Sequence, residues 1–150
     1  MAAKKTAAAI LKAFYDAETE YMAAPEDQRD ISAMSAVLSP DLEIIQTPAL
    51  PYPGTFRGLQ GLQEWSSKMA SYFDVLEVQK PQVYEREGSD SVVSVSNLHL
   101  RVRETGQVLD FPLCQVIKVD LDKGQILEIR PFYWDVQGLN EAVGFAPSRR

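Results

Sequence analysis

Apolar residues recur every three or four positions in the first half of the chain, a spacing that is typical of amphipathic helices. The pattern predicts helices over residues 6–24 and 59–73, and a short helix over 31–38 that begins after Asp30 as its N-cap. One face of the first helix consists of Leu11, Phe14, Tyr15, Glu18, Tyr21 and Met22. Glu18 is charged, and an unpaired charge is costly to bury. It either lines a pocket or reaches the helix edge to pair with an arginine.

The pattern changes to alternation in the second half of the chain. Strands are predicted over 76–86, 91–103, 107–120 and 125–134, separated by turns that contain glycine, so that neighbours form antiparallel hairpins. An earlier strand is expected over 41–47. Pro81 and Pro112 each remove a hydrogen-bond donor from the ladder, and they indicate bulges or edge positions that bend the sheet.

Helices followed by strands predict an α+β fold in which a strongly bent sheet curls over the first and third helices. We expect one domain over residues 1–150, because 150 residues with 45% hydrophobic content suit a single core. A sheet curled in this way forms a cone with an opening, and small-molecule sites favour such openings. The loop over 48–54, which contains three prolines, is suited to form a fixed rim.

Charge and composition restrict the partners and the chemistry. The formal net charge is −6 and no basic cluster stands out, so we expect neither nucleic acid nor a membrane as a partner. With a single cysteine and a single histidine, the chain lacks a Cys/His metal cluster, and we expect no metal and no organic cofactor. Asp16 and Glu18 interrupt the apolar N-terminal stretch too early for a secretory signal, which indicates a cytoplasmic protein.

Alternation assigns the strand residues to two faces. The inner face of the third long strand consists of Phe111, Leu113, Gln115, Ile117 and Val119, which makes Gln115 a polar group on the buried side. In the last strand, Leu127, Ile129, Pro131, Tyr133 and Asp135 share a face, and we therefore expect Asp135 at the inner rim. The outer face carries Val93, Val95, Cys114, Val116, Phe132 and Trp134. These side chains predict a homodimer that forms through the outer sheet face.

From Phe14-Tyr15 through residues 58–62 to the terminal strand and Tyr133-Trp134-Asp135-Val136, the chain resembles the SnoaL-like group of the NTF2-like superfamily. This resemblance implies a cone of N-terminal helices on a bent mixed or antiparallel sheet that encloses a pocket. SnoaL-like cyclases usually end a similar strand in His-Trp-Asp-Val, where the Asp is the acid/base of a cofactor-free aldol ring closure. That role is carried over to Asp135, whereas Tyr133 stands in the place of the usual histidine.

The chain is also similar to the ketosteroid isomerase branch of the superfamily. The general-base aspartate of that branch would fall on Thr47, and its oxyanion acid near Gln115, so steroid-type isomerisation by the same residues is not expected. Tyr15 matches the hydrogen-bond-donating tyrosine. Together with Gln115 it would polarise a carbonyl, because donors held in place stabilise a developing enolate.

These patterns predict a cofactor-independent cyclase or isomerase acting on a polyketide-like or polycyclic metabolite. The predicted catalytic residues are Asp135, Glu18 and Tyr15. The predicted substrate-binding residues are Gln115, Tyr133, Gln46, Tyr52, Trp65 and Leu113. The alternative is a non-catalytic small-molecule-binding or dimerisation module, since a fold does not determine a function. Asp135 itself has a structural alternative, because a carboxylate at a strand end also caps a following helical turn.

Overall fold

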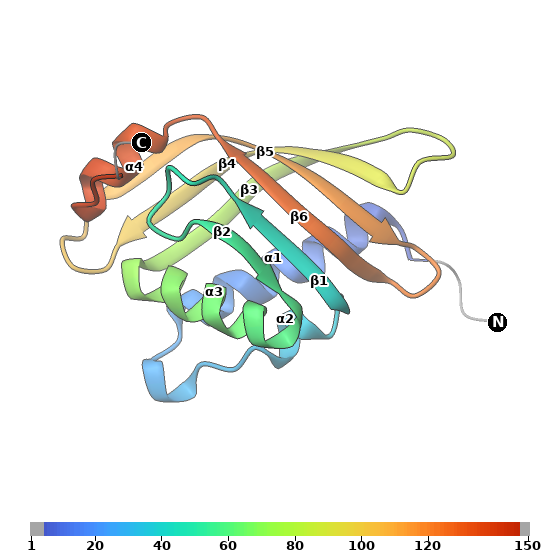
Figure 1. The fold of residues 1–150 in the computed structure, drawn as a ribbon, viewed down its shortest axis with the longest axis horizontal. Helices are drawn as coiled ribbons and strands as arrows, with labels where there is room; N and C mark the ends of the chain where they lie inside the picture. Colours follow the sequence, from blue (N-terminus) through green and yellow to red (C-terminus); the bar gives the residue numbers. More distant parts are fainter. Residues whose placement is uncertain (1–4, 148–150) are drawn as a thin grey trace.

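A six-stranded mixed sheet bends around two long helices in the computed structural model, which describes residues 5–147 (Figure 1). The strands are β1 (Leu38–Gln46), β2 (Gly54–Arg57), β3 (Phe73–Glu85), β4 (Ser91–Val102), β5 (Val108–Asp120) and β6 (Gln125–Tyr133). The helices are α1 (Ala7–Ala23), the 3-10 helix η1 (Glu26–Gln28), α2 (Ser32–Ser35), α3 (Gly58–Tyr72) and α4 (Val136–Val143). The predicted α+β architecture is confirmed.

The strand order is β2-β1-β6-β5-β4-β3, and the sheet is open. Strands β3 to β6 form the predicted antiparallel meander. Two features of the sheet lay outside the sequence prediction. Strand β2 pairs antiparallel with β1, and β1 pairs parallel with β6 although most of the chain separates them. Period-two alternation does not reveal such a pairing, because it reports the faces of a strand and not its neighbours.

Helix α1 begins where Thr6 Oγ1 accepts a hydrogen bond from the Ala9 amide at 3.1 Å, and it ends before Pro25. Helix α3 approaches β2 closely at Gly61, where a Cβ atom would lie 2.7 Å from the Phe56 carbonyl carbon. Only glycine permits that approach. Both helices lie on the same side of the sheet, and the core fills the space between them and the strands (Figure 1).

The helix predicted over 31–38 is wrong in its extent. Only Ser32–Ser35 is helical, and Leu38 already belongs to β1, where it is in register with Ile126 of β6. The amide of Ile126 donates to the Val37 carbonyl at 2.8 Å. Long-range pairing with β6 thus overrides the local helical preference. Pro40 lies inside β1 at a register shift in the β1–β6 ladder, because its nitrogen has no hydrogen to donate.

The two prolines predicted to mark bulges or edge positions differ from each other. Pro81 follows Lys80, which has a φ of 50°, at a register shift between Gln79 and Gln82 in the β3–β4 ladder. A predicted bulge is therefore present in β3. Pro112 lies just beyond the last residues of β5 and β6 that are in register, Leu113 and Tyr133, and it is in regular register with Asn97 of β4, so no bulge forms there. Its carbonyl accepts a hydrogen bond from the Trp134 amide at 3.2 Å.

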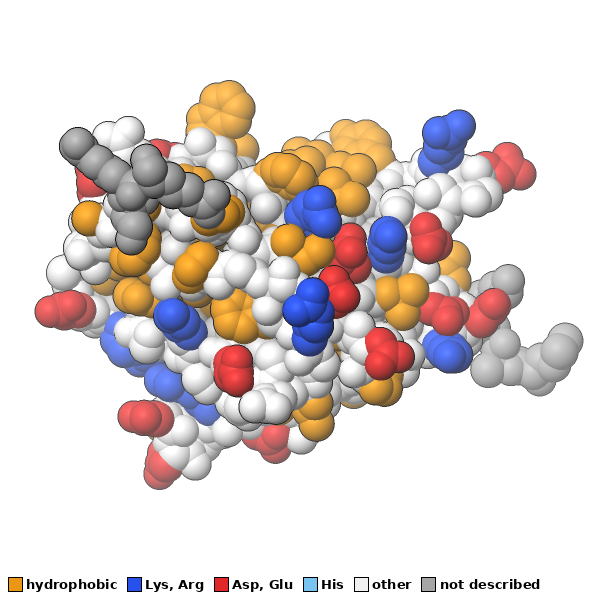
Figure 2. Space-filling view, viewed as in Figure 1, with side chains coloured by type: hydrophobic (Ala, Val, Ile, Leu, Met, Phe, Trp, Pro, Cys, Tyr) orange, Lys and Arg blue, Asp and Glu red, His pale blue; other side chains and the backbone are white. Residues whose placement is uncertain are grey.

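The surface view shows basic and acidic side chains interspersed on one face of the molecule, with apolar side chains along its upper edge (Figure 2). Within residues 5–147, no helix is both long enough and apolar enough to cross a membrane.

Candidate active site

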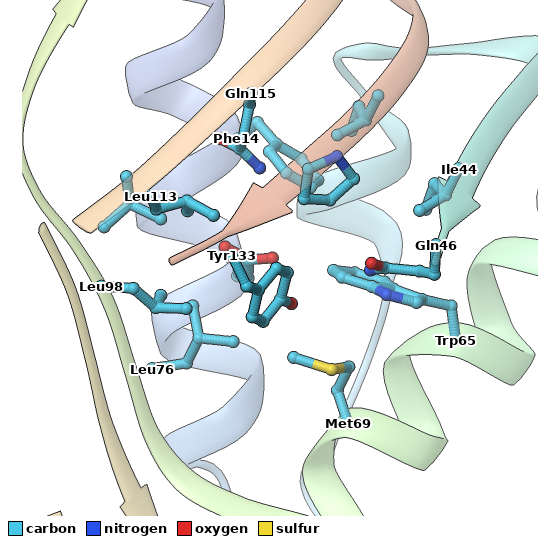
Figure 3. A pocket seen from close by; sticks show the side chains of 14 residues that line it. Phe14, Ile44, Gln46, Trp65, Met69, Leu76, Leu98, Leu113, Gln115 and Tyr133 are labelled. Carbon is cyan, nitrogen blue, oxygen red and sulfur yellow. The ribbon is translucent and has the colours of Figure 1, made fainter. Parts of the chain in front are cut away.

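The two helices and the inner face of the sheet enclose a cavity lined by 14 residues (Figure 3). Its walls consist of Phe14, Glu18, Ile44, Gln46, Trp65, Met69, Leu76, Val78, Leu98, Leu113, Gln115, Ile129, Pro131 and Tyr133. The free space is about 20 Å³, which is enough for a group about the size of one water molecule. Val78 and Tyr133 are the only lining residues that are partly exposed rather than buried.

Glu18 supplies the carboxyl group of this cavity. It lies on the inner face of α1, one turn after Phe14, and its side chain is 5% exposed. Among the described residues, none forms a hydrogen bond or an ion pair with its carboxyl. Burial without a partner raises the pKa of Glu18 to about 8, because the charged form loses its hydration. At neutral pH the group is mostly protonated and able to donate, and above pH 8 it is able to accept a proton.

A pair of tyrosines lies beside Glu18. Tyr52, fully buried in the proline-rich loop between β1 and β2, donates a hydrogen bond to the Tyr133 hydroxyl at 3.0 Å. The hydrogen of Tyr133 is then available for an acceptor in the cavity. Burial is the main cause that raises the pKa of both phenols, and the charge of Glu18 adds to the shift in each. The hydrogen bond from Tyr52 opposes the shift at Tyr133.

Two further lining side chains present polar atoms without partners. Both the Nε2 and the Oε1 atoms of Gln46, and the Nε1 atom of Trp65, are buried and have no hydrogen-bond partner within residues 5–147. The Gln46 amide lies close enough to the Tyr133 phenol to oppose the rise in its pKa, although the two groups do not meet the geometry of a hydrogen bond. Figure 3 shows Gln46, Trp65 and Tyr133 converging on one side of the cavity. Buried polar groups are normally paired, so these atoms mark the place in the cavity where a water molecule or a ligand group would be bound.

Tyr15 and Gln115 form the contact that the sequence suggested, but with a different consequence. The Tyr15 hydroxyl donates to Gln115 Oε1, and it lies 3.1 Å from Ser94 Oγ. Its hydrogen is therefore already in use, and Tyr15 is a lining residue of an open cleft between α1 and β3 and not of the cavity. Tyr15 thus orients the Gln115 amide, and Gln115 is the member of the pair that reaches the cavity.

The prediction that Asp135 lies at the inner rim of the cavity is wrong. Its side chain is exposed, and its Oδ1 accepts a hydrogen bond from the Gly138 amide at 2.8 Å as the N-cap of α4. Strand β6 ends at Tyr133, so the alternation that assigned Asp135 to the inner face no longer applies two residues later. The neighbouring Trp134 is 81% exposed. The structural alternative for Asp135 is the correct one.

The other predicted site residues are distributed over two layers. Gln46, Trp65, Leu113, Gln115, Tyr133 and Glu18 line the cavity, and Tyr52 and Tyr15 stand behind it. Met69, which follows Trp65 by one helical turn, and Ser94, the neighbour of Tyr15, were not among the predicted site residues. Their spacing nevertheless puts them on the inner faces of α3 and β4, since helix residues four apart and alternate strand residues share a face.

Comparison with solved structures places this arrangement among known folds. An NTF2-like protein from Burkholderia xenovorans is 23% identical over 91% of this chain and 94% of that chain, with a TM-score of 0.69. A protein from Catenulispora acidiphila with a ketosteroid isomerase-like fold is 12% identical over 97% and 99%, with a TM-score of 0.71. A protein from Shewanella denitrificans described as a SnoaL-like polyketide cyclase is 15% identical over 91% and 96%, with a TM-score of 0.66.

In sequence, the chain matches no protein-family model and no curated protein. The structural similarity nevertheless covers 91% to 97% of the chain in these three comparisons. The chain has the NTF2-like cone fold, with the SnoaL-like and ketosteroid isomerase-like proteins among its structural neighbours. The resemblance deduced from the sequence is confirmed at the level of the fold.

Proposed function

We propose that this protein is a cofactor-independent isomerase or cyclase in which Glu18 transfers a proton next to a substrate carbonyl. The observation that supports this proposal is the Glu18 carboxyl, which is buried, unpaired among the described residues and adjacent to unpartnered hydrogen-bond donors. An acid/base catalyst works best when its pKa lies near the working pH, and burial raises the pKa of Glu18 to about 8. The structural neighbours with isomerase-like and cyclase-like descriptions support the same class of chemistry.

In the proposed isomerisation, the Glu18 carboxylate removes a proton from the carbon next to the carbonyl. The electron pair moves to the carbonyl oxygen, where the Tyr133 hydroxyl, the Gln46 Nε2 hydrogens or the Trp65 indole hydrogen stabilise the enolate. Glu18 then returns the proton to another carbon of the conjugated system, and the product has the same mass. In a cyclisation, the enolate carbon instead attacks a second carbonyl of the same molecule, and protonated Glu18 neutralises the alkoxide.

The proposed substrates are polyketide-like or polycyclic carbonyl compounds, because the cavity walls are mainly apolar. A space of about 20 Å³ admits a carbonyl group and its neighbouring carbon only if side chains of the wall move. Met69 is the most adaptable of these side chains, since it is unbranched.

Deuterium exchange tests this proposal without knowledge of the natural substrate. Small cyclic enones and 1,3-diketones in D2O exchange the protons next to the carbonyl, and NMR measures the rate. We expect the protein to accelerate exchange, with a rate that rises through about pH 8, and Glu18→Gln to abolish the acceleration. Glu20→Gln, which changes an exposed carboxylate on the same helix, is the matched control. Equal acceleration by the wild type and Glu18→Gln would remove Glu18 from the mechanism.

A second candidate function is a non-catalytic binding or dimerisation module, which the small volume of the cavity favours. The outer face of the sheet supports a homodimer. Val95 and Phe132 are 40% and 54% exposed and flank Cys114 in adjacent strands, so they form a continuous apolar row. A second copy of the chain would cover this row by a two-fold contact.

A further inference from the structure

The unpartnered amide of Gln46 restricts the kind of molecule that the cavity recognises. Gln46 lies at the end of β1 and is 3% exposed, and neither its donor nor its acceptor atom has a partner within residues 5–147. Leaving both atoms unpaired in the interior destabilises the fold, because each loses the hydrogen bond that it makes with water in the unfolded chain. A side chain that serves only the stability of the core would be replaced by an apolar one at little cost.

The donors and acceptors of the cavity follow a definite pattern. Gln46 presents one donor and one acceptor side by side on the edge of a planar amide, and Trp65 adds a second donor. Figure 3 shows the Gln46 amide and the Trp65 indole next to each other at the wall opposite Leu98 and Leu113. A ligand that satisfies Gln46 must therefore carry an acceptor and a donor on the same edge, and the Trp65 indole requires an acceptor as well.

The charges of the cavity exclude ionic ligands. Among the described residues that line it there is no Lys, Arg or His, so an anion would find no positive charge there and would be repelled by the Glu18 carboxylate. A cation would satisfy Gln46 Oε1 but would leave the hydrogens of Gln46 Nε2 and Trp65 Nε1 without acceptors. A neutral ligand is the one that pairs all three atoms.

We propose that the ligand of this cavity is a neutral molecule that carries a cis donor–acceptor pair, as in a lactam or an α-hydroxyenone, and that Gln46 recognises this pair by two hydrogen bonds. In an α-hydroxyenone the carbonyl oxygen accepts from Gln46 Nε2, and the hydroxyl donates to Gln46 Oε1. This inference rests on the same cavity as the proposed function and names its substrate class. Plain ketones and esters lack the donor, and they leave Gln46 Oε1 unpaired.

Binding of small probes tests the pairing directly. The probes are 2-piperidone and an enolised cyclopentane-1,2-dione, each compared with its N-methyl or O-methyl derivative, which keeps the acceptor and loses the donor. Calorimetry measures the affinities, and Trp65 fluorescence in a Trp134→Phe background confirms the site, because the chain has two tryptophans. We expect each parent probe to bind about tenfold more tightly than its methylated form, as the loss of one buried hydrogen bond implies.

Gln46→Met tests the role of the Gln46 amide, and Gln46→Leu repeats the test with a second apolar side chain. Both should fold, since they remove unpaired polar atoms, and both should bind parent and methylated probes equally. Gln60→Met, an exposed glutamine on α3, should keep the preference. No preference in the wild type, a preference retained in Gln46→Met, no binding of any probe, or failure of both variants to fold would each overturn the inference.

The proposed function and this inference fail separately. A preference for the parent probes without deuterium exchange would retain the ligand class and remove the catalytic proposal. Deuterium exchange of simple ketones without a preference for the parent probes would retain the catalytic proposal and remove the ligand class. Glu18→Gln should lose exchange and keep the preference.

Discussion

The hydroxyl of Tyr52 donates a hydrogen bond to the hydroxyl of Tyr133 across 3.0 Å, which joins the loop after β1 to the end of β6. Because Tyr133 accepts this bond, its own hydrogen is directed to another acceptor. Tyr52 is fully buried, whereas Tyr133 is partly exposed and lines the cavity. The hydrogen bond from Tyr52 thus holds the Tyr133 hydroxyl in position.

Substitution of the two tyrosines should separate their roles. Tyr133→Phe removes the donor itself and should lower the exchange rate by about 100-fold, as the loss of a donor to a developing enolate does. Tyr52→Phe keeps that donor but removes its support, so we expect a smaller loss, about tenfold, and a stability loss of about 1 kcal/mol. NMR exchange rates and urea denaturation measure the two effects. Tyr84→Phe, at an exposed site, is the control. An equal loss of exchange rate in Tyr133→Phe and Tyr52→Phe would contradict the supporting role of Tyr52.

The stability of the protein should depend on pH through Glu18. Its pKa rises from 4.5 when exposed to about 8 in the folded state, so between these values the folded protein holds a proton that the unfolded chain has released. The stabilisation is complete below about pH 4.5 and is lost as the pH rises to 8. Glu18→Gln removes this dependence on pH. At pH 9 its free energy of unfolding should exceed that of the wild type by roughly 3 to 5 kcal/mol. Urea denaturation at pH 5, 7 and 9 tests this, and parallel curves for the two proteins would contradict it.

Asp135 should contribute to stability and not to proton transfer. Asp135→Ala removes the N-cap of α4 and should cost about 1 kcal/mol, whereas Asp135→Asn retains the acceptor and should cost little. Both variants should exchange deuterium at the wild-type rate, since the side chain is exposed and bonded to Gly138. A large loss of exchange in Asp135→Asn would restore the carboxylate to the mechanism.

The apolar row on the outer face should determine the oligomeric state. Phe132→Lys introduces a charge into the apolar row of the proposed contact, beside Cys114, and we expect it to convert a dimer into a monomer in analytical ultracentrifugation. Val108→Lys changes an exposed apolar residue at the beginning of β5 and should leave the dimer intact. A wild-type protein that sediments as a monomer would refute the proposed dimer.

Sequence periodicity predicted most of the elements, because each repeat reports on residues a few positions apart. The inner face of α1, the long strands β3 to β6 and the buried position of Gln115 all follow from local alternation. The inner-face assignment was wrong at Asp135, where the strand ends and alternation loses its meaning.

The sequence by itself therefore determined the class of the fold and the helix face on which Glu18 lies, but it left open whether that carboxylate is buried. Only the tertiary structure decided the parallel pairing of β1 with β6, the support of Tyr133 by Tyr52 and the unpaired amide of Gln46. The physical reason is distance along the chain. A hydrogen bond between residues 81 positions apart, such as Tyr52–Tyr133, leaves no periodic trace in the sequence, and a missing partner leaves none either.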